Sequence, residues 1–249
     1  MVVQNNNDQR DIFFNTTETA SNYLQKKTGS IYRYFRLSEF ADSLSHENAK
    51  LRNSLKTSKY STEFVIDTVS DKSLLQKFTF TPAHIIANSI DKKYNYLTLD
   101  KGTEQGIEKH SGVINESGVV GIVTDVSKHY SRVMSLLNKK TMISTSVKRS
   151  GFFGTLKWTG EGTRDFKLVN IPKHADLLKG DTLQTSGYSS MFPKGINIGT
   201  ITNFKIDPGS NFFDIDVKLF NDLSRAEYVY IVTNIFRDEQ QQLGEEENE

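Results

Sequence analysis

The stretch YLTLDKG, residues 96–102, decides the class of fold that the sequence predicts. Its first four residues alternate as in a strand with one face on a core, and its last three form a turn signal. A similar pattern follows, because the segments 111–115 and 119–126 flank the turn residues 116–118 as in a short hairpin. These short strands joined by tight turns predict a β-rich region around the stretch.

The strand pattern continues from Phe78 to Phe236, a region rich in Val, Ile, Thr, Phe and Tyr. All four prolines and all but one of the 16 glycines follow residue 80, so turns are frequent there. No amphipathic helix interrupts the region, which favours an all-β barrel or sandwich over a parallel α/β sheet. Further candidate strands lie at 131–137, 143–148, 165–169, 182–185, 198–204, 212–219 and 228–233.

The N-terminal part of the chain, residues 16–72, is predicted to be a coiled-coil helix. Its apolar positions recur at the 4, 3, 4, 3, 4 spacing of a heptad seam, and a buried Asn in such a seam often fixes register and strand number. An amphipathic helix packed on the head of its own chain is the alternative. We favour pairing, because a helix of this length is too long for one head to cover. The expected dimerisation residues are Leu37, Ala41, Leu44, Asn48, Leu51 and Leu55.

Composition excludes several classes of function. The chain has 249 residues, enough for one large or two small domains, and its formal net charge of +1 gives no reason to expect nucleic acid as a partner. It contains no cysteine, which removes disulfides, thiol catalysis and cysteine-based zinc sites. The acidic residues 237–249 have little apolar surface, which predicts a disordered tail.

Candidate catalytic and metal-binding groups are sparse. The five histidines show no metal-ligand spacing, so we expect no metal, no cofactor and no catalytic residues. One exception stays open: His84 or His110 with Ser186 could form a triad on a protease-like barrel, making the protein a hydrolase. Asp214 and Asp216 alternate with apolar residues and are expected on a solvated strand face.

Six segments, taken in order, resemble the rod shape-determining protein MreC family. Single segments are weak signals, but their order over about 100 residues is specific. Three positions depart from the family pattern, namely Gln105, Ser117 and Asn197, and they affect turn details only. The segments are YLTLDKGTEQGI (96–107), SGVVGIV (117–123), SRV (131–133), RSGFFG (149–154), KGDTLQTSG (179–187) and FPKGINIG (192–199).

This resemblance implies a fold that is mainly β, with two small β-barrels in a chymotrypsin-like arrangement but no working catalytic triad. We place the first barrel at 78–150 and the second at 151–236, with the alternative that one barrel is inserted in the other. Residues 1–15 would be a membrane-proximal segment. A membrane helix would precede it and end near Val3.

The resemblance also implies a function. Members of the family dimerise through the helix and can assemble further through the heads. They link MreB and MreD to penicillin-binding transpeptidases at the extracytoplasmic, periplasmic face of the bacterial inner membrane. We therefore expect a non-catalytic scaffold of cell elongation that organises or activates peptidoglycan synthases. A non-enzymatic alternative is an extracytoplasmic adaptor that binds glycans or lipids.

The shared segments consist mostly of glycine turns, which describe a shape and no chemistry. We expect Gly102, Gly121, Gly154, Gly187 and Gly195 where strands end or reverse, several with positive φ. The full set of expected turn residues is Asp100, Lys101, Gly102, Gly106, Gly118, Gly121, Gly151, Gly154, Gly180, Asp181, Ser186, Gly187, Pro193, Gly195 and Gly199.

Overall fold

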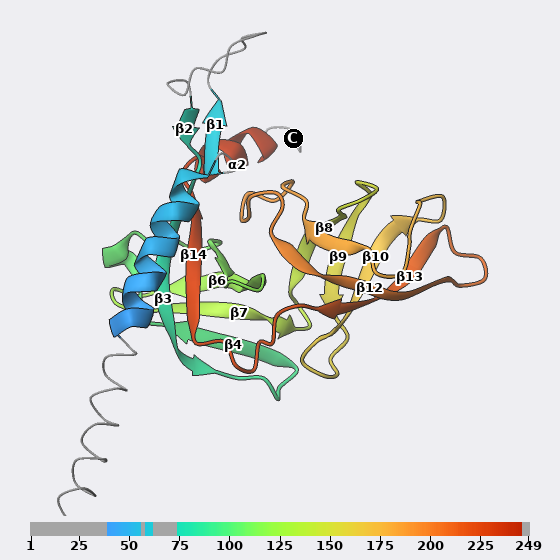
Figure 1. Ribbon diagram of the computed structural model, residues 1–249, viewed down its shortest axis with the longest axis horizontal. Helices are drawn as coiled ribbons and strands as arrows, with labels where there is room; N and C mark the ends of the chain where they lie inside the picture. Colours follow the sequence, from blue (N-terminus) through green and yellow to red (C-terminus); the bar gives the residue numbers. More distant parts are fainter. Residues whose placement is uncertain (1–38, 56–57, 62–73, 246–249) are drawn as a thin grey trace, which may run out of the picture. The chain divides into compact units, whose positions relative to one another are not determined.

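Two closed six-stranded antiparallel barrels dominate the structure, a computed structural model that describes residues 39–55, 58–61 and 74–245 (Figure 1). The chain divides into a unit of residues 1–47 and a unit of residues 48–249, and both barrels belong to the second. The first barrel has the strand order β14-β3-β4-β7-β6-β5 and the second β10-β13-β12-β11-β8-β9. The strands are β3 (Phe78–Asn88), β4 (Tyr94–Leu99), β5 (Gly112–Ile114), β6 (Val119–Val126), β7 (Ser131–Asn138), β8 (Met142–Val147), β9 (Phe153–Trp158), β10 (Asp165–Pro172), β11 (Thr182–Thr185), β12 (Asn197–Ile206), β13 (Phe212–Leu219) and β14 (Tyr228–Asn234).

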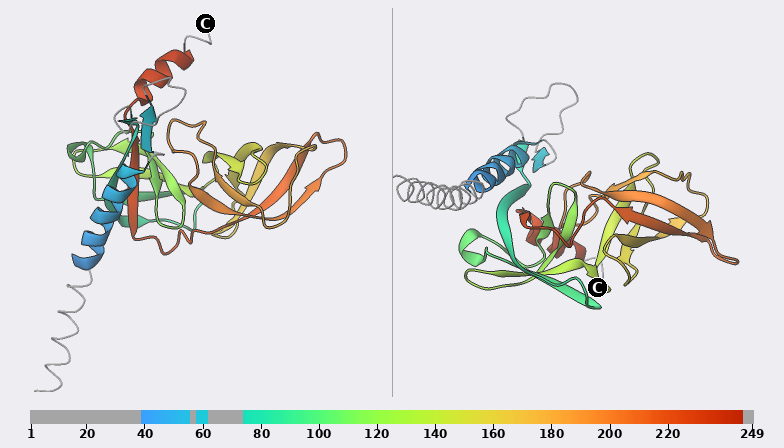
Figure 2. Two further views of the ribbon diagram at one scale, coloured as in Figure 1. Left: turned by 45° about the horizontal axis from the view of Figure 1, so that its top comes forward. Right: turned by 60° about the horizontal axis from the view of Figure 1, so that its bottom comes forward.

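The second barrel is inserted into the first between β7 and β14. The expected boundary at residues 150 and 151 is therefore wrong, because β8 already belongs to the second barrel and β14 returns to the first. Figure 2 shows this return, with the red strand β14 among the green strands of the first barrel. Strand β14 pairs with β3 over seven residues and with β5 on its other side, which closes the first barrel.

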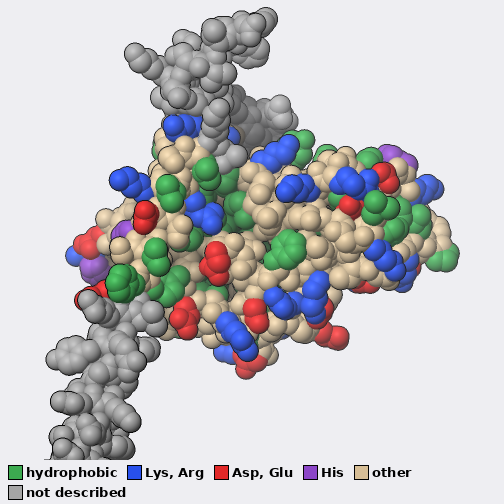
Figure 3. All heavy atoms as spheres, in the orientation of Figure 1, with side chains coloured by type: hydrophobic (Ala, Val, Ile, Leu, Met, Phe, Trp, Pro, Cys, Tyr) green, Lys and Arg blue, Asp and Glu red, His purple; other side chains and the backbone are tan. Residues whose placement is uncertain are grey.

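The alternation of β13 shows why these sequences form barrel strands. Ile215, Val217 and Leu219 are buried, while the intervening Asp214 and Asp216 face outward, as predicted. The amine of Lys167 on β10 lies 2.8 Å from a carboxylate oxygen of each aspartate, and this contact lowers the pKa of Asp216. Over the face seen in Figure 3, positive and negative side chains are interspersed.

The helix over 39–54 ends well before residue 72, where the sequence had placed its end. Ser58 closes this end, because its hydroxyl donates over 2.8 Å to the carbonyl of Arg52, which also accepts the backbone N–H of Leu55 over 3.2 Å. The short strands β1 (Lys59–Ser61) and β2 (Leu74–Gln76) follow and pair antiparallel. The sequence after Leu55 is rich in Thr, Phe, Val and Ile, which favour strands over helix.

The start of the acidic tail is also ordered. Residues 237–245 were expected to be disordered, but they form helix α2 (Arg237–Glu245). Arg237 is buried and donates to the carboxylate of Glu108 over 2.8 Å and to the carbonyl of Lys109, so the helix is fixed to the first barrel. The negative charges of Asp238 and Glu239 in the first turn interact favourably with the positive end of the helix dipole.

Candidate functional site

The contact between the two barrels, called here the barrel junction, is built from Gly112, Asn115, Gly118, Phe192 and Asn221. Phe192 belongs to the FPKGINIG segment of the second barrel and is only 2% exposed. A Cβ atom placed on Gly112 of β5 would lie 2.4 Å from the ring of Phe192. The ring therefore packs directly on the backbone of the first barrel, which only glycine permits at this position.

Buried amides form the second part of the barrel junction. The side-chain amide of Asn115 donates to Asn221 over 3.0 Å, and Asn221 donates to the carbonyl of Val119 over 3.2 Å. Gly118 lies beside them, where a Cβ would come within 2.4 Å of the carbonyl oxygen of Asn197. Because buried amides are costly without partners, these bonds favour one relative placement of the two barrels.

A cleft of about 630 Å³ opens beside the barrel junction. Arg52 and Leu55 at the end of the helix line one side, and the turn at Ser117 lines another. Residues 193–197 and Phe220 form further parts of the lining. Its lining is mixed in polarity and brings together no catalytic set of side chains.

The expected turn glycines fall into two groups. Gly187 and Gly195 have φ values of 81° and 96°, so a turn with positive φ requires glycine there. Gly121 and Gly154 lie inside β6 and β9, where a Cβ would approach a neighbouring backbone oxygen to 2.3 and 2.4 Å. The expectation of turns at these two positions, and at Gly199 inside β12, is wrong. The other members of the expected set with positive φ are Gly106, Gly118, Gly151 and Gly180. At Gly102 and Gly199, a Cβ atom would again lie too close to a neighbouring backbone oxygen.

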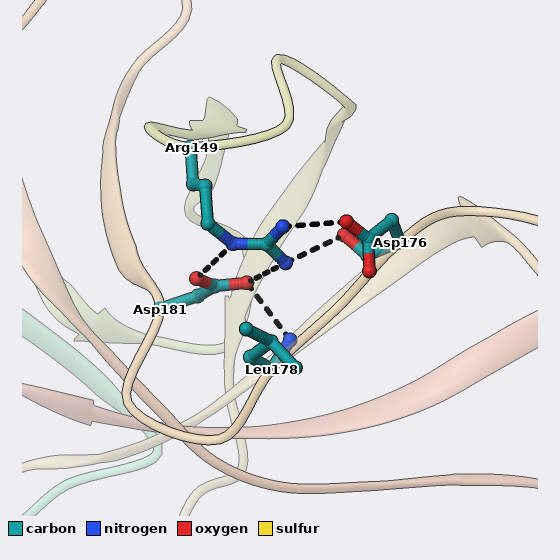
Figure 4. A network of polar contacts seen from close by, with 4 residues as sticks. All are labelled: Arg149, Asp176, Leu178 and Asp181. Carbon is teal, nitrogen blue, oxygen red and sulfur yellow. Dashed lines mark hydrogen bonds and ion pairs between the residues drawn. The ribbon is translucent and has the colours of Figure 1, made fainter.

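Two of the recognised segments meet at Arg149 (Figure 4). Its guanidinium donates to both carboxylate oxygens of Asp181 over 2.9 Å and to a carboxylate oxygen of Asp176 over 2.5 Å. The backbone N–H of Leu178 also donates to Asp181. These bonds lower the pKa of Asp181, with Arg149 as the main cause, and they raise the pKa of Arg149. They hold the loop before β11 against the turn before β9.

Asp100 and Lys101, two of the expected turn residues, hold the turn after β4. A carboxylate oxygen of Asp100 accepts the backbone N–H of His84 over 2.8 Å, and Lys101 pairs with the same carboxylate over 3.1 Å. Pro193 lies in the loop of the second barrel, where its carbonyl accepts the hydroxyl of Thr185 over 2.6 Å. These contacts are structural and fix turns to neighbouring strands.

The proposed helix seam is exposed within the described part of the chain. Leu44, Leu51 and Leu55 are 57%, 58% and 52% exposed, and Asn48 on the same side is exposed as well. Ala41 is half-buried, and Leu37 lies outside the described residues. The leucines repeat at intervals of seven and four residues, which places them on one side of an α-helix.

The other side of the helix end packs on the first barrel. Ala49 is buried, and the side-chain oxygen of Asn53 accepts the backbone N–H of Phe80 over 2.9 Å. The guanidinium of Arg52 lies 5.0 Å from the ring centre of Tyr230. The alternative of a helix packed on its own head thus holds for this side, while the leucine side is left without cover from the described residues of its own chain.

Comparison with known families identifies the barrels. The profile described as "Rod shape-determining protein MreC, barrel core" matches residues 85–233, which include most of both barrels. The chain belongs to the MreC family. The resemblance drawn from the six segments is therefore confirmed.

Curated relatives from the family carry one name, cell shape-determining protein MreC. The Escherichia coli protein is 28% identical over 149 residues, a match that covers 59% of this chain and 40% of the relative. The Listeria monocytogenes protein is 27% identical over 193 residues, covering 72% of this chain and 60% of the relative. The chain thus spans about half the length of these relatives.

Solved MreC structures share the fold. The Pseudomonas aeruginosa structure is 25% identical, with a TM-score of 0.57 over 61% of this chain and 98% of that one. A second structure, described as the major periplasmic domain of the cell shape-determining filament MreC, is 22% identical with a TM-score of 0.56 over 64% and 98% of the two chains. A third, from Helicobacter pylori, is 16% identical with a TM-score of 0.51 over 64% and 99%, and it is a complex between penicillin-binding protein PBP2 and MreC.

The residues that the sequence offers for a triad lie on different barrels of the head. Ser186 is on the second barrel, where its hydroxyl is 2.7 Å from that of Ser144 and accepts the backbone N–H of Tyr188. His84 lies on β3 of the first barrel, with its ring 4.4 Å from that of Tyr228. His110 precedes β5 of the same barrel with a φ of 64°. Within the described residues, no group of three His, Asp or Glu side chains could hold a metal ion.

No helix in the described part of the chain is long and apolar enough to cross a bilayer.

Several residues of the barrel junction were not predicted from the sequence. Asn115 and Asn221 are 106 positions apart, and no spacing rule connects them. Gly112 gave no turn signal because it lies within a strand. Phe192 was recognised only as part of a segment, and its large apolar side chain beside Pro193 is the one local hint of a buried contact.

Proposed function

We propose that this chain is a non-catalytic, dimeric scaffold of the bacterial cell-elongation machinery, which controls cell shape by organising or activating peptidoglycan synthases. The observation that carries the proposal is the exposed leucine seam on a helix whose opposite side is anchored to the first barrel. A second helix in register would cover Leu44, Leu51 and Leu55, with Asn48 selecting that register. The dimer would hold two heads at a fixed spacing.

The partner of the head is, in this proposal, a penicillin-binding transpeptidase. The support is the Helicobacter pylori complex of PBP2 with an MreC chain of the same fold. The resemblance to the family adds MreB and MreD to the proposed assembly. The head would work on the periplasmic face of the inner membrane, anchored by a helix preceding this sequence.

Activation of an enzyme by such a scaffold has a simple energetic limit. Binding can shift the transpeptidase toward its active state only as far as the head prefers that state over the inactive one. A head with one fixed placement of its barrels suits this role, because little binding energy is lost in ordering it. The amides and the packed Phe192 of the barrel junction supply that rigidity.

The direct test is capture of a transpeptidase by the purified chain. The chain is immobilised and exposed to detergent extracts of bacterial membranes, and penicillin-binding proteins are detected with a labelled β-lactam. We expect one elongation-class transpeptidase to be retained by the parent protein. A dispersed control variant, Leu44→Asp with Leu51→Asp, keeps its head and should retain less enzyme because avidity is lost.

Two results would count against the proposal. One is retention of no penicillin-binding protein by a correctly folded parent. The other is normal cell shape in a strain that depends on a folded, abundant variant unable to retain the enzyme.

A further inference from the structure

The loop that joins β11 to β12 in the second barrel contacts two neighbouring strands of the first barrel. A Cβ atom on Gly112 of β5 would lie 2.6 Å from the carbonyl oxygen of Met191, and the ring of Phe192 packs on the same glycine. One residue before Met191, the carbonyl of Ser190 accepts the side-chain amide of Asn234 over 2.9 Å. Asn234 ends β14, which pairs with β5. The loop is therefore held by both strands.

Asn234 also connects this loop to the C-terminal helix α2. Its side chain is buried, at 4% exposed. The amide nitrogen that donates to Ser190 donates as well to the side-chain oxygen of Gln240 on α2, over 3.0 Å. The side-chain oxygen of Asn234 accepts the backbone N–H of Phe236 over 3.1 Å. Because a buried amide is costly without partners, the contact with the loop and the docking of α2 support each other.

Helix α2 is suited to docking weakly. Its sequence, RDEQQQLGE, contains one large apolar residue, so burial of apolar surface can contribute little. A helix of nine residues is also unstable on its own in water. Its ion pair with the first barrel, between Arg237 and Glu108, is open to screening by salt because Glu108 is 53% exposed. We therefore expect α2 to belong to the parts of the head that open most readily.

We propose that α2 is a releasable clasp that fixes the placement of the second barrel relative to the first. With α2 docked, Gln240 orients the amide of Asn234 toward Ser190, and the loop is held on β14. With α2 released, Asn234 loses this support, and the second barrel is held by the barrel junction alone. Its placement then varies more. Any partner that binds one of these two states more tightly shifts the balance between them.

The consequence of the clasp for activity rests on the proposed scaffold function. A transpeptidase that contacts both barrels would bind most tightly while their placement is fixed, because ordering two mobile barrels costs binding free energy. Docking of α2 would then regulate capture of the enzyme without changing the surface that the enzyme contacts. The C-terminal end of the chain is thus a control point for the head.

The test is the distance between two spin labels, one on each barrel, measured in the full chain by pulsed electron paramagnetic resonance. The chain has no cysteine, so Lys92→Cys on the first barrel and Lys179→Cys on the second give two unique sites, and both lysines are exposed. We expect a single narrow distribution of distances in the labelled parent. Arg237→Ala should broaden this distribution because the ion pair that docks α2 is lost.

The matched control is Arg225→Ala, which removes an exposed arginine from the loop before β14. It should keep the narrow distribution, as should deletion of residues 246–249 beyond α2. Gln240→Ala separates release of the clasp from loss of fold, because Gln240 is exposed and its removal leaves Arg237 in place. It should broaden the distribution less than Arg237→Ala and leave the melting temperature of the head unchanged.

A distribution that stays narrow in both Arg237→Ala and Gln240→Ala would overturn the clasp. A broad distribution in the parent, or equal broadening by Arg225→Ala, would do the same. If Arg237→Ala unfolds the head, Gln240→Ala decides alone, with broadening in favour of the clasp and a narrow distribution against it. Transpeptidase capture by the parent is measured separately, so failure of the clasp leaves the scaffold proposal standing.

Discussion

The barrel junction and the helix seam are both built from apolar and amide side chains, but only the junction is satisfied within one chain. Phe192 is packed on Gly112, and Asn115 is bonded to Asn221. On the helix, Leu51 remains more than half exposed, and Asn48 beside it is exposed too. The same kinds of residue thus serve folding in one place and are available for association in the other.

This difference separates what the head needs for stability from what the protein needs for assembly. A change at the barrel junction should lower the stability of the head and leave the seam free to pair. A change on the seam should prevent pairing and leave the head intact. Two measurements on each sample, thermal unfolding and mass in solution, therefore distinguish the two regions.

The largest effect on stability is expected for Gly112→Ala. The added methyl group would meet both the ring of Phe192 and the carbonyl of Met191, and we expect a loss of about 3 kcal/mol in the free energy of unfolding. The measurement is chemical denaturation followed by the fluorescence of the single tryptophan, Trp158.

The matched control for this substitution is Gly106→Ala. Gly106 has a φ of 72° and open space around it, so alanine should cost only about 1–2 kcal/mol through its backbone conformation. Adding Phe192→Leu to Gly112→Ala should recover part of the loss by making room. Equal costs at the two glycines would show that the ring contact does not hold the barrels together.

A smaller effect is expected for Asp181→Asn, which changes a contact inside the second barrel. Arg149 lowers the pKa of Asp181, so this carboxylate stabilises the fold above its ordinary value of about 3.9, and the contribution is lost as the pH falls through the lowered value. At pH 7 the variant should lose about 1–3 kcal/mol.

The pH dependence of this difference is its check. The gap in melting temperature between the parent and Asp181→Asn should be constant near neutrality and shrink only below about pH 4. Asp214→Asn, on the solvated side of the same barrel, is the control and should cost less, because its partner Lys167 is partly exposed and also pairs with Asp216. A gap that grows in acid would mean that the carboxylate is not stabilised by Arg149.

Much of the head could be predicted because its signals are local. Apolar and polar residues alternate in segments such as 212–219, and turn signals such as the one after Leu99 mark where strands end. Such signals predict a strand even when its neighbours in the sheet are unknown. The glycine turns at Gly187 and Gly195 were predictable for the same reason, since positive φ is a property of one residue.

The remaining features depend on contacts between distant residues. Gly121 and Gly154 lie within strands, and only the approach of Met134 and Val169 explains them. The insertion of one barrel in the other needs β14 to pair with β3, about 150 residues earlier, which no local pattern reveals. Helix α2 was missed because its anchor is the contact of Arg237 with Glu108.

The measurement that tests the scaffold account most directly is sedimentation equilibrium of the parent chain beside Leu44→Asp with Leu51→Asp. Aspartate in a paired seam would bury charge at a cost of several kcal/mol. The account predicts a dimeric parent and a monomeric variant with the same melting temperature for the head, since both leucines are more than half exposed in the single chain. A monomeric parent, or a variant that remains dimeric, would contradict it.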